Sequence, residues 1–378
     1  MIKCYSKETC KEFVLRRLHL TPNTLGKEKG DVPTIVSDIG GLQYGGHELE
    51  LFSRFTNFHS SWYDYWFQNH TLIEGHVLRG ALRIVTLDEY PSFFKATRSV
   101  ARRRRYQACP TSLNVNHHLA LTAIEHSGPV TPSEFKVELC KEHPDLEKSA
   151  KKLLYDLYNY GKVVRVGRRK NKPLYHVLDE LPSELDLSQT SEKEAKRWLL
   201  RTCLSIYGPF TVKDIAHWVR WRITETRNIL DDVLKTGKVT EVRVEEDQRR
   251  HFACTKDLDV LDSFTDKLPE YSFVRILFND DALLLGYYKR LHAFFGYDWC
   301  YPQFSEGVSW RAGILYGREL IGEAIVDKSA RSPTFEIKNL ILRKAFSKAH
   351  ILSKVKARCR KHAEYLNKRL KIRKITEQ

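Results

Sequence analysis

Two stretches decide the fold of this chain: HHLALTAIEHSGPVTPSEF at residues 117–135 and AKRWLLRTCLSIYGPFTVKDI at residues 195–215. Both continue in the same way, with a longer apolar helix pattern, GKV and two alternating segments, at 148–181 and at 224–258. Self-similarity at a fixed spacing indicates one supersecondary unit that is used twice. Each copy predicts an apolar helix, a turn, a short helix, a longer helix and two strands.

The turn residues explain this order. Gly128 and Gly208, each followed by Pro, end the first helix, because Gly takes the left-handed C-terminal position and Pro cannot continue a helix. Thr131 and Thr211 are placed to cap the next helix. The pattern therefore predicts a helix-turn-helix in each copy.

The segments after each longer helix predict a hairpin. KVVRV and KVTEVRV alternate with the period of a half-buried strand, and PLYHV and HFACT supply the returning strands. A helix-turn-helix followed by such a wing is a winged helix. The first wing has no acidic residue and is predicted to contact DNA phosphates through its cations, which are Arg165, Arg168, Arg169, Lys170 and Lys172.

The second wing differs in charge. It carries Glu245, Glu246 and Asp247 beside Arg249 and Arg250. We expect it to bind phosphate poorly and to pack against a neighbouring part of the chain.

The predicted fold class is α+β, with tandem winged-helix units, a small β-rich C-terminal part and a terminal basic helix. Strand-like alternation predominates from Phe273 to Leu342, and the apolar positions after Ile341 step by three and four. The expected domains are a divergent winged helix at 1–105, a winged helix with the basic wing at 106–188, another winged helix at 189–262, a β-rich domain at 263–342 and a basic amphipathic helix at 343–378.

Charge favours a polyanionic partner. The 378 residues carry a formal net charge of +16, of which residues 341–378, with thirteen Lys or Arg and two Glu, supply +11. The eight cysteines are dispersed without a CxxC pair, so no zinc cluster or disulfide framework is signalled. The polar N-terminus and the absence of a long apolar run predict a cytoplasmic, nucleoid-associated protein that is neither secreted nor bound to a membrane.

Four segments together resemble the AlkZ/YcaQ family of winged-helix DNA glycosylases. They occur in the family's order, with the repeated units between them, and are IGGLQYGGHELELFSRF (39–55), VLRGALRIVTLDEY (77–90), the stretch from FND to FFGYDW (278–299) and GILYGRELIGEAIVDK (313–328). The resemblance implies three tandem winged helices around a cleft. It also implies hydrolysis of the N-glycosidic bond of N7-alkylated or crosslinked purines in double-stranded DNA, without a metal or organic cofactor.

The family's active site is a Gln-x-Gln or Gln-x-Asp motif, which aligns with Gln43-Tyr44-Gly45. Gln43 is the implied catalytic residue, because an amide can hold a water by hydrogen bonds. The second side chain is missing at Gly45. His47 and Glu48 follow closely, and our hypothesis is that His47, or else Glu48, supplies the missing polar group.

Further site residues follow from the resemblance. Arg79 matches the family's Arg-Gly step and is assigned to scaffold or DNA-backbone contact rather than chemistry. Trp310 and Arg311, after Ser309, stand for the family's basic and aromatic hairpin, with stacking or wedging at the lesion as the implied role. The sequence leaves other readings open: a tandem winged-helix DNA-binding or regulatory protein without catalysis, which Gly45 favours, and an RNA-binding protein.

Overall fold

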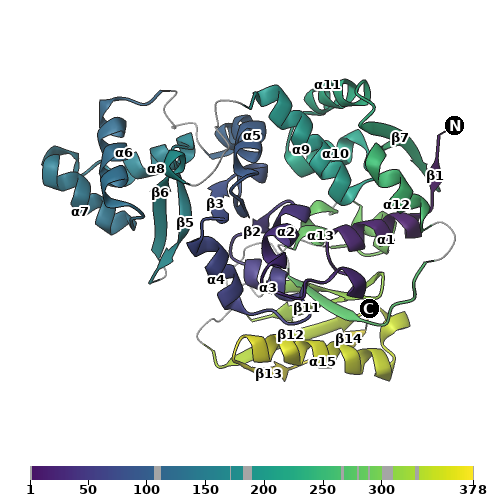
Figure 1. The fold of residues 1–378 in the computed structure, drawn as a ribbon. Helices are drawn as coiled ribbons and strands as arrows, with labels where there is room; N and C mark the ends of the chain where they lie inside the picture. Colours follow the sequence, from purple (N-terminus) through teal and green to yellow (C-terminus); the bar gives the residue numbers. More distant parts are fainter. Residues whose placement is uncertain are drawn as a thin grey trace.

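The computed structural model describes residues 2–105, 112–170, 172–181, 190–264, 268–278, 281–287, 290–299, 310–327 and 332–377, with the side chains of 101–105 left out. The chain mixes helices with three sheets (Figure 1). No helix within these ranges is both long and apolar enough to cross a membrane.

The two copies of the repeat each fold as three helices followed by an antiparallel hairpin. Thr131 and Thr211 cap their helices as predicted, and each forms a reciprocal capping box with an acid, Glu134 or Asp214. The first copy consists of α6 (Val115–Ser127), α7 (Pro132–Glu142), α8 (Ala150–Tyr160), β5 (Val163–Arg169) and β6 (Lys172–Val177); the second consists of α9 (Glu192–Tyr207), α10 (Val212–Val219), α11 (Ile223–Leu234), β7 (Val239–Val244) and β8 (Asp247–Cys254).

The first hairpin is not a free wing. Its strand β5 pairs with β3 of the first unit, where Arg165 lies opposite Glu74. One five-stranded sheet, in the order β2-β4-β3-β5-β6, therefore joins the first unit to the first repeat. The other elements of the first unit are α2 (Asp31–Asp38), β2 (Leu42–Gln43), α3 (His47–Phe52), α4 (Ser60–Gln68), β3 (Leu72–His76), β4 (Leu82–Thr86) and α5 (Tyr90–Arg105).

The second hairpin packs against its neighbour, as predicted. The N-terminal strand β1 (Cys4–Tyr5) pairs in parallel with β7, and Lys7 at the start of α1 (Lys7–Arg17) lies 2.7 Å from Glu246 at the hairpin tip. This edge of the hairpin is thus covered by the chain itself.

The C-terminal part is β-rich as expected, but its last segment is not a continuous helix. The helix α15 (Ala349–Tyr365) ends at Tyr365, and Leu370 belongs to a strand. Two short strands, half-buried at alternate positions, pair in parallel with β12 and close the chain. The sheet holds β9 (Val274–Phe278), β10 (Trp310–Tyr316), β11 (Glu319–Val326), β12 (Thr334–Leu342), β13 (Arg369–Ile372) and β14 (Ile375–Glu377).

Short helices complete the described fold. The α-helical turns are α12 (Leu258–Asp262), α13 (Ala282–Gly286) and α14 (Leu291–Phe295). The 3-10 turns are η1 (Pro22–Thr24), η2 (Leu78–Gly80), η3 (Pro144–Leu146), η4 (Leu178–Glu180), η5 (Thr255–Asp257) and η6 (Lys344–Phe346).

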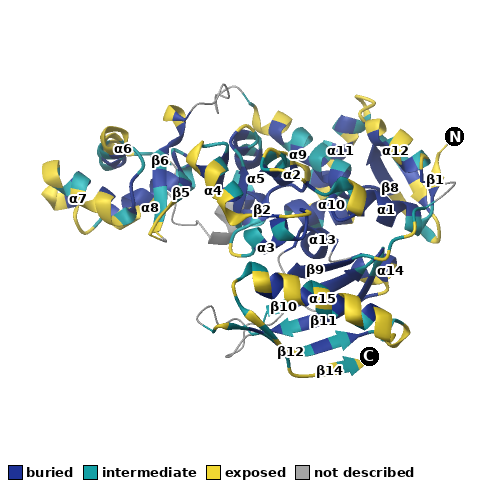
Figure 2. Cartoon of the chain, turned by 60° about the horizontal axis from the view of Figure 1, so that its bottom comes forward, coloured by how far each residue is buried: buried dark blue, intermediate teal, exposed yellow. Residues whose placement is uncertain are grey.

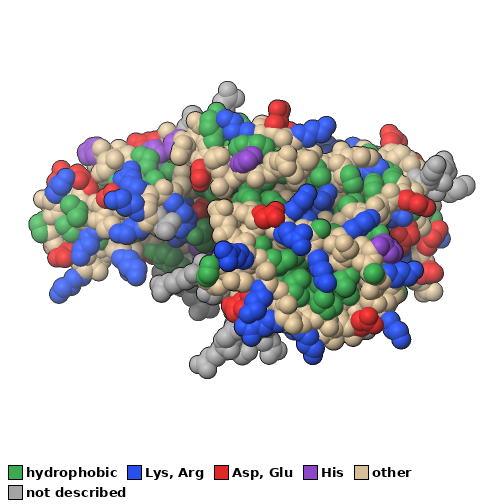
Figure 3. Space-filling model, turned by 90° about the horizontal axis from the view of Figure 1, so that it is seen from below, with side chains coloured by type: hydrophobic (Ala, Val, Ile, Leu, Met, Phe, Trp, Pro, Cys, Tyr) green, Lys and Arg blue, Asp and Glu red, His purple; other side chains and the backbone are tan. Residues whose placement is uncertain are grey.

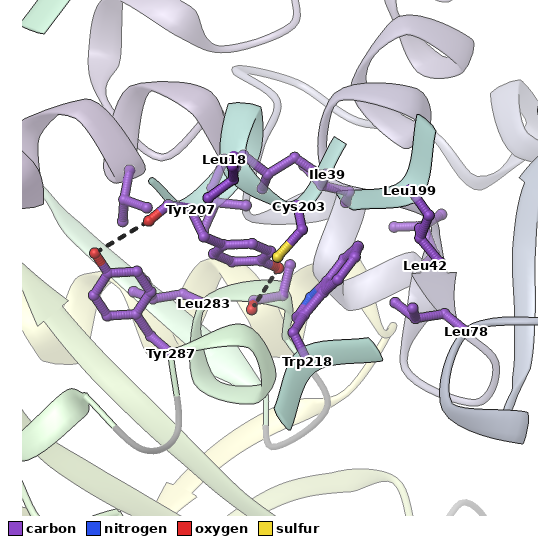
Figure 4. Close-up of a cluster of buried hydrophobic side chains, with 14 of the residues drawn as sticks. Leu18, Ile39, Leu42, Leu78, Leu199, Cys203, Tyr207, Trp218, Leu283 and Tyr287 are labelled. Atoms are coloured by element: carbon purple, nitrogen blue, oxygen red, sulfur yellow. Dashed lines mark hydrogen bonds between the residues drawn. The ribbon is translucent and has the colours of Figure 1, made fainter. Parts of the chain in front are cut away.

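A continuous apolar core ties the first unit to the second repeat and to α13. The hydroxyl of Tyr207 donates to the carbonyl of Ala282 at 3.0 Å, and the hydroxyl of Tyr287 donates to the carbonyl of Tyr207 at 3.4 Å (Figure 4). Gly286 packs directly on the Tyr207 ring, where a Cβ would lie 2.3 Å from ring carbons. Figure 2 shows this buried interior running between the helices. The described elements around Tyr207 therefore hold one another in fixed positions.

A buried ion cluster joins two of the segments that carry the family resemblance. The Arg54 guanidinium, fully buried after α3, bonds both carboxylate oxygens of Asp281 at 2.7 and 3.1 Å. Asp281 also caps α13 by accepting from the backbone N–H of Leu283, and Glu50 accepts from the backbone N–H of Ala282. Asp281, which follows the strand β9, thus serves both as a helix cap and as an ion-pair partner.

Candidate functional site

Gln43 lies at the end of β2, on the edge of the five-stranded sheet. Its backbone pairs with Arg83 of β4, and its side chain is half-buried. The chain turns at once after it, since the backbone N–H of Gly46 donates to the carbonyl of Gln43 at 3.4 Å. The turn leads into α3, which begins at His47.

Gly45 holds a backbone conformation that explains the missing side chain. Its φ is +103°, a region that L-residues rarely adopt, and nothing lies within 4 Å of the position a Cβ would take. Space is therefore available, but a Gln or Asp would be strained here.

A cavity of about 850 Å³ opens beside this turn. It is large enough for a nucleobase with its sugar. Its walls come from the turn and the start of α3, from α4, from β3 and from the first hairpin. The residues that carry its chemistry are Tyr44, His47, Glu48, Tyr63, Asp64, Glu74 and Arg168. Gln43 precedes Tyr44 at the edge of the cavity and is not among its lining residues.

Aromatic rings form one wall of the cavity. The imidazole of His47 stacks on Tyr44 at 5.8 Å between ring centroids and lies 4.6 Å from the Tyr63 ring. The guanidinium of Arg168 lies 4.6 Å from the Tyr44 centroid. Such a wall can stack a planar base on its faces.

His47 is a neutral ring in this setting. Burial and then the nearby charge of Arg168 lower the pKa of its imidazole to about 4. A group with so low a pKa accepts a proton poorly near neutral pH. The geometry therefore suits His47 to stacking and to hydrogen bonding as an uncharged group.

Three carboxylates face the cavity, and burial raises the pKa of each. Glu48 also accepts a hydrogen bond from the hydroxyl of Tyr365, which lowers its pKa in part. Asp64 has burial alone as the cause, and Glu74, only 1% exposed, is held by Arg168 and Arg165 at 3.7 Å each. Sequence reasoning missed Asp64 and Glu74, although the aromatic run SSWYDYWFQNH drew attention to α4; Glu74 carries no local signal.

The cations of the first hairpin point to this cavity and to neighbouring acids. Arg169 pairs with Glu134 of α7 at 2.8 Å, and Arg165 and Arg168 flank Glu74. Lys170 lines the cavity, and the Lys172 ammonium lies 3.4 Å from the Ser133 hydroxyl. The hairpin lacks acids in its own sequence but meets them from other elements.

Arg79 lies in η2 with a left-handed φ of 64°. Its guanidinium donates to the carbonyl of Leu285 at 3.4 Å and lies 3.5 Å from Nε2 of His217. These contacts connect the first unit to α13 and α10, and the predicted role of Arg79 in the scaffold or in DNA-backbone contact stays a prediction. They do not bring Arg79 among the residues that line the cavity.

Trp310 and Arg311 begin β10, in the C-terminal sheet. The indole of Trp310 is half-buried and meets the Phe278 ring edge to face at 5.9 Å, while Arg311 lies 3.4 Å from Glu323 of β11. Ser309 lies outside the described residues. Both side chains are packed on their own sheet, and their predicted contact with a lesion stays a prediction.

Metal chemistry finds no ready site among the residues that the structure describes, since no group of three or more His, Cys, Asp or Glu could hold an ion there. His117, half of the adjacent histidine pair, takes part in the cap of α6 with Asn114. The ring contacts Asp156 at 3.4 Å on its other side.

The chain matches a known protein family over most of its length. The family described as DNA glycosylase AlkZ-like matches residues 36–362. The chain belongs to the AlkZ-like DNA glycosylase family. Membership confirms the predicted resemblance and the predicted class of function, a DNA-glycosylase-like protein of DNA repair.

A solved structure agrees with the assignment. The Streptomyces sahachiroi DNA glycosylase AlkZ matches with a TM-score of 0.69 at 16% identity, over 98% of this chain and 99% of that chain. At such low identity the likeness establishes the shared fold alone. No curated protein matches this AlkZ-like chain in sequence.

Proposed function

We propose that this protein is a DNA glycosylase that hydrolyses the N-glycosidic bond of N7-alkylated or crosslinked purines in double-stranded DNA. The observation that carries the proposal is the cavity directly after Gln43, with stacking rings on one wall and three carboxylates around it. A flipped purine bearing a positive charge fits aromatic faces and acids better than a neutral pocket would.

In the proposed reaction Gln43 orients a water toward C1′ of the deoxyribose. The C1′–N9 bond breaks, and its electron pair neutralises the cationic base as it leaves. The water oxygen bonds to C1′ and yields the abasic sugar. Because an amide cannot take the proton of the water, a carboxylate must do so.

Glu48 is the proposed proton acceptor. It lies in the first turn of α3, five residues after Gln43, faces the cavity and accepts a hydrogen bond from Tyr365. It takes the place of the side chain lost at Gly45. His47 lies beside it as a neutral stacking surface, and Glu74 is engaged by two arginines.

Both repeats are proposed to be winged helices, and the first of them is proposed to bind the duplex. Their order of three helices and a hairpin, with capped second helices, supports this role. The first hairpin would bring Lys170 and Lys172 to the phosphates beside the cavity. Arg79 would support the scaffold, and Trp310 and Arg311 would approach the duplex from the C-terminal sheet.

Abasic-site formation tests the proposal. The purified protein is incubated in excess with a duplex that carries N7-methylguanine or a nitrogen-mustard crosslink, beside Gln43→Ala. We expect base release by the wild type and a rate about 10- to 100-fold lower for the variant, since a positioned group of this kind contributes roughly this much. Absence of release by the wild type would reject the proposal.

A second candidate is a DNA-binding protein without catalysis, and the absence of a side chain at Gly45 favours it. It predicts salt-sensitive duplex binding without any release of base. The same incubation, with binding measured in parallel, distinguishes the two.

A further inference from the structure

The C-terminal segment concentrates positive charge on one side of the molecule. Residues 341–378 contain thirteen Lys or Arg and two Glu. Figure 3 looks at the side where Figure 1 shows α15, and Lys and Arg side chains are spread among hydrophobic and other atoms there. The exposed cations of α15 and of the strands that follow are Lys354, Arg360, Lys361, Arg369, Lys371, Arg373 and Lys374.

Most of this charge is not neutralised by the fold. Arg373 pairs with Glu336. Within the described parts of the chain, Lys354, Arg360 and Lys361 of α15 take part in no ion pair, because no carboxylate lies within 4 Å of them. A surface that holds unpaired cations together is electrostatically unfavourable unless a polyanion or salt covers it.

The apolar face of α15 is already occupied. Ile351, Val355, Cys359 and Ala363 are buried against the C-terminal sheet. A helix that binds a membrane surface inserts its apolar face between the lipids, and α15 has none to offer. Only its cationic face is available to a partner.

This face adjoins the proposed active site. The last residue of α15, Tyr365, bonds Glu48 in the cavity wall, and its ring packs on Phe52 of α3 at 4.5 Å. Lys361 stands one helical turn before Tyr365. A helix of seventeen residues is about 25 Å long, which corresponds to about seven base pairs of duplex.

We propose that the exposed cations of α15 form a second DNA-backbone contact surface, which holds the duplex on the flank of the lesion. The inference rests on the proposed function for the identity of the polyanion. It adds a part of the interface outside the two repeats, which binds phosphates without reading sequence.

The test compares two triple variants of the full chain. The first replaces Lys354, Arg360 and Lys361, the exposed cations of α15, by Gln. The second, a matched control, replaces Lys235, Lys238 and Lys256, which are exposed and take part in no ion pair within the described ranges. Lys235 follows α11, which Figure 1 shows on the opposite side from α15. Far-ultraviolet circular dichroism and the urea midpoint establish that each variant is folded.

Affinity for an undamaged 24-base-pair duplex is measured by fluorescence anisotropy between 0.05 and 0.3 M KCl. Each phosphate contact contributes about one to the slope of log Kd against log salt. We expect the slope of log Kd against log salt to be smaller by about three for the α15 variant than for the wild type. The variant should also bind the duplex on the order of 100-fold more weakly at 0.15 M salt. The control should change the slope by less than one.

Equal slopes in the wild type and the α15 variant, or equal losses in both variants, would overturn the proposal. So would unchanged duplex affinity together with a loss of binding to phosphatidylserine vesicles. Base release at saturating protein is scored separately, and the α15 variant should match the wild type there. If the wild type releases no base but the α15 variant shows the predicted loss of slope, the proposed function is rejected and the proposed DNA-contact surface on α15 is supported.

Discussion

The hydroxyl of Tyr365, at the end of α15, donates a hydrogen bond of 3.3 Å to Oε2 of Glu48 at the start of α3. The two residues are 317 positions apart in the sequence. Burial raises the pKa of Glu48, and this hydrogen bond opposes the rise because it favours the charged carboxylate. The C-terminal part thereby helps to keep the proposed proton acceptor ionised.

Tyr365→Phe should shift the acidic side of the pH–rate profile of base release to higher pH. Without the hydroxyl the pKa of Glu48 rises further, so a larger fraction is protonated and inactive as the pH falls. A hydrogen bond to a charged carboxylate corresponds to a shift of about one to two pH units. The single-turnover rate measured from pH 5 to 8 checks it, and Tyr65→Phe on the exposed face of α4 is the control. An unchanged pH–rate profile would show that this hydrogen bond does not affect the pKa of Glu48.

Asp281→Asn should destabilise the fold by about 3–5 kcal/mol, because it removes the nearer of the two carboxylates that balance the buried charge of Arg54 and leaves Glu50 at 3.7 Å. The Asn can still cap α13, so the variant isolates the ion pair. Asp262→Asn, which breaks a surface pair with Lys3, should lower the free energy of unfolding by less than about 1 kcal/mol. Urea unfolding measures both, and equal effects would contradict the structural role given to Arg54.

Gly45→Gln recreates the family motif in sequence but should not raise activity. At φ +103° the new side chain strains the turn, and we expect a loss of about 1–2 kcal/mol in the free energy of unfolding. Gly30→Ala is the matched control, since its φ of −61° suits any residue. A Gly45→Gln protein with unchanged stability and a higher rate of base release would mean that the turn adapts readily.

Glu134→Gln should strengthen duplex binding by several-fold at 0.1 M salt. The change frees Arg169 from its partner at 2.8 Å, while the Gln keeps the cap on Thr131. The control is Glu246→Gln, which frees Lys7 at the second hairpin, where no DNA contact is expected. Equal gains from both changes would indicate a general charge effect and not a contact by the first hairpin.

Local signals in the sequence were sufficient for much of the fold. Thr131 and Thr211 each lie directly before a helix, where a Thr side chain can cap the backbone N–H three residues later, and both caps form. The strands from Phe273 to Leu342 follow from their own alternation. These features depend on neighbours in the chain, which is why the sequence predicts them.

Pairings between distant segments were not predictable in this way. The pairing of Glu74 with Arg165 joins two units, which we expected to be separate, into one sheet. No sequence pattern near either residue predicts this pairing. The last residues leave the helix pattern because β12 offers a free edge to Leu370 and Ile372. The candidate site likewise contains features that the sequence predicts and features that it does not. Gln43 was identified from a motif, whereas the approach of Tyr365 to Glu48 depends on the whole fold.

The most direct test is release of N7-methylguanine from a duplex under single-turnover conditions by the wild type and by Glu48→Gln. The account predicts release by the wild type and a rate at least about 100-fold lower in the variant, because loss of a general base has an effect of this size. Asp64→Asn, at another acid in the cavity, should stay within several-fold of the wild type. Release by Glu48→Gln at the wild-type rate, or no release by the wild type despite tight binding, would contradict the account.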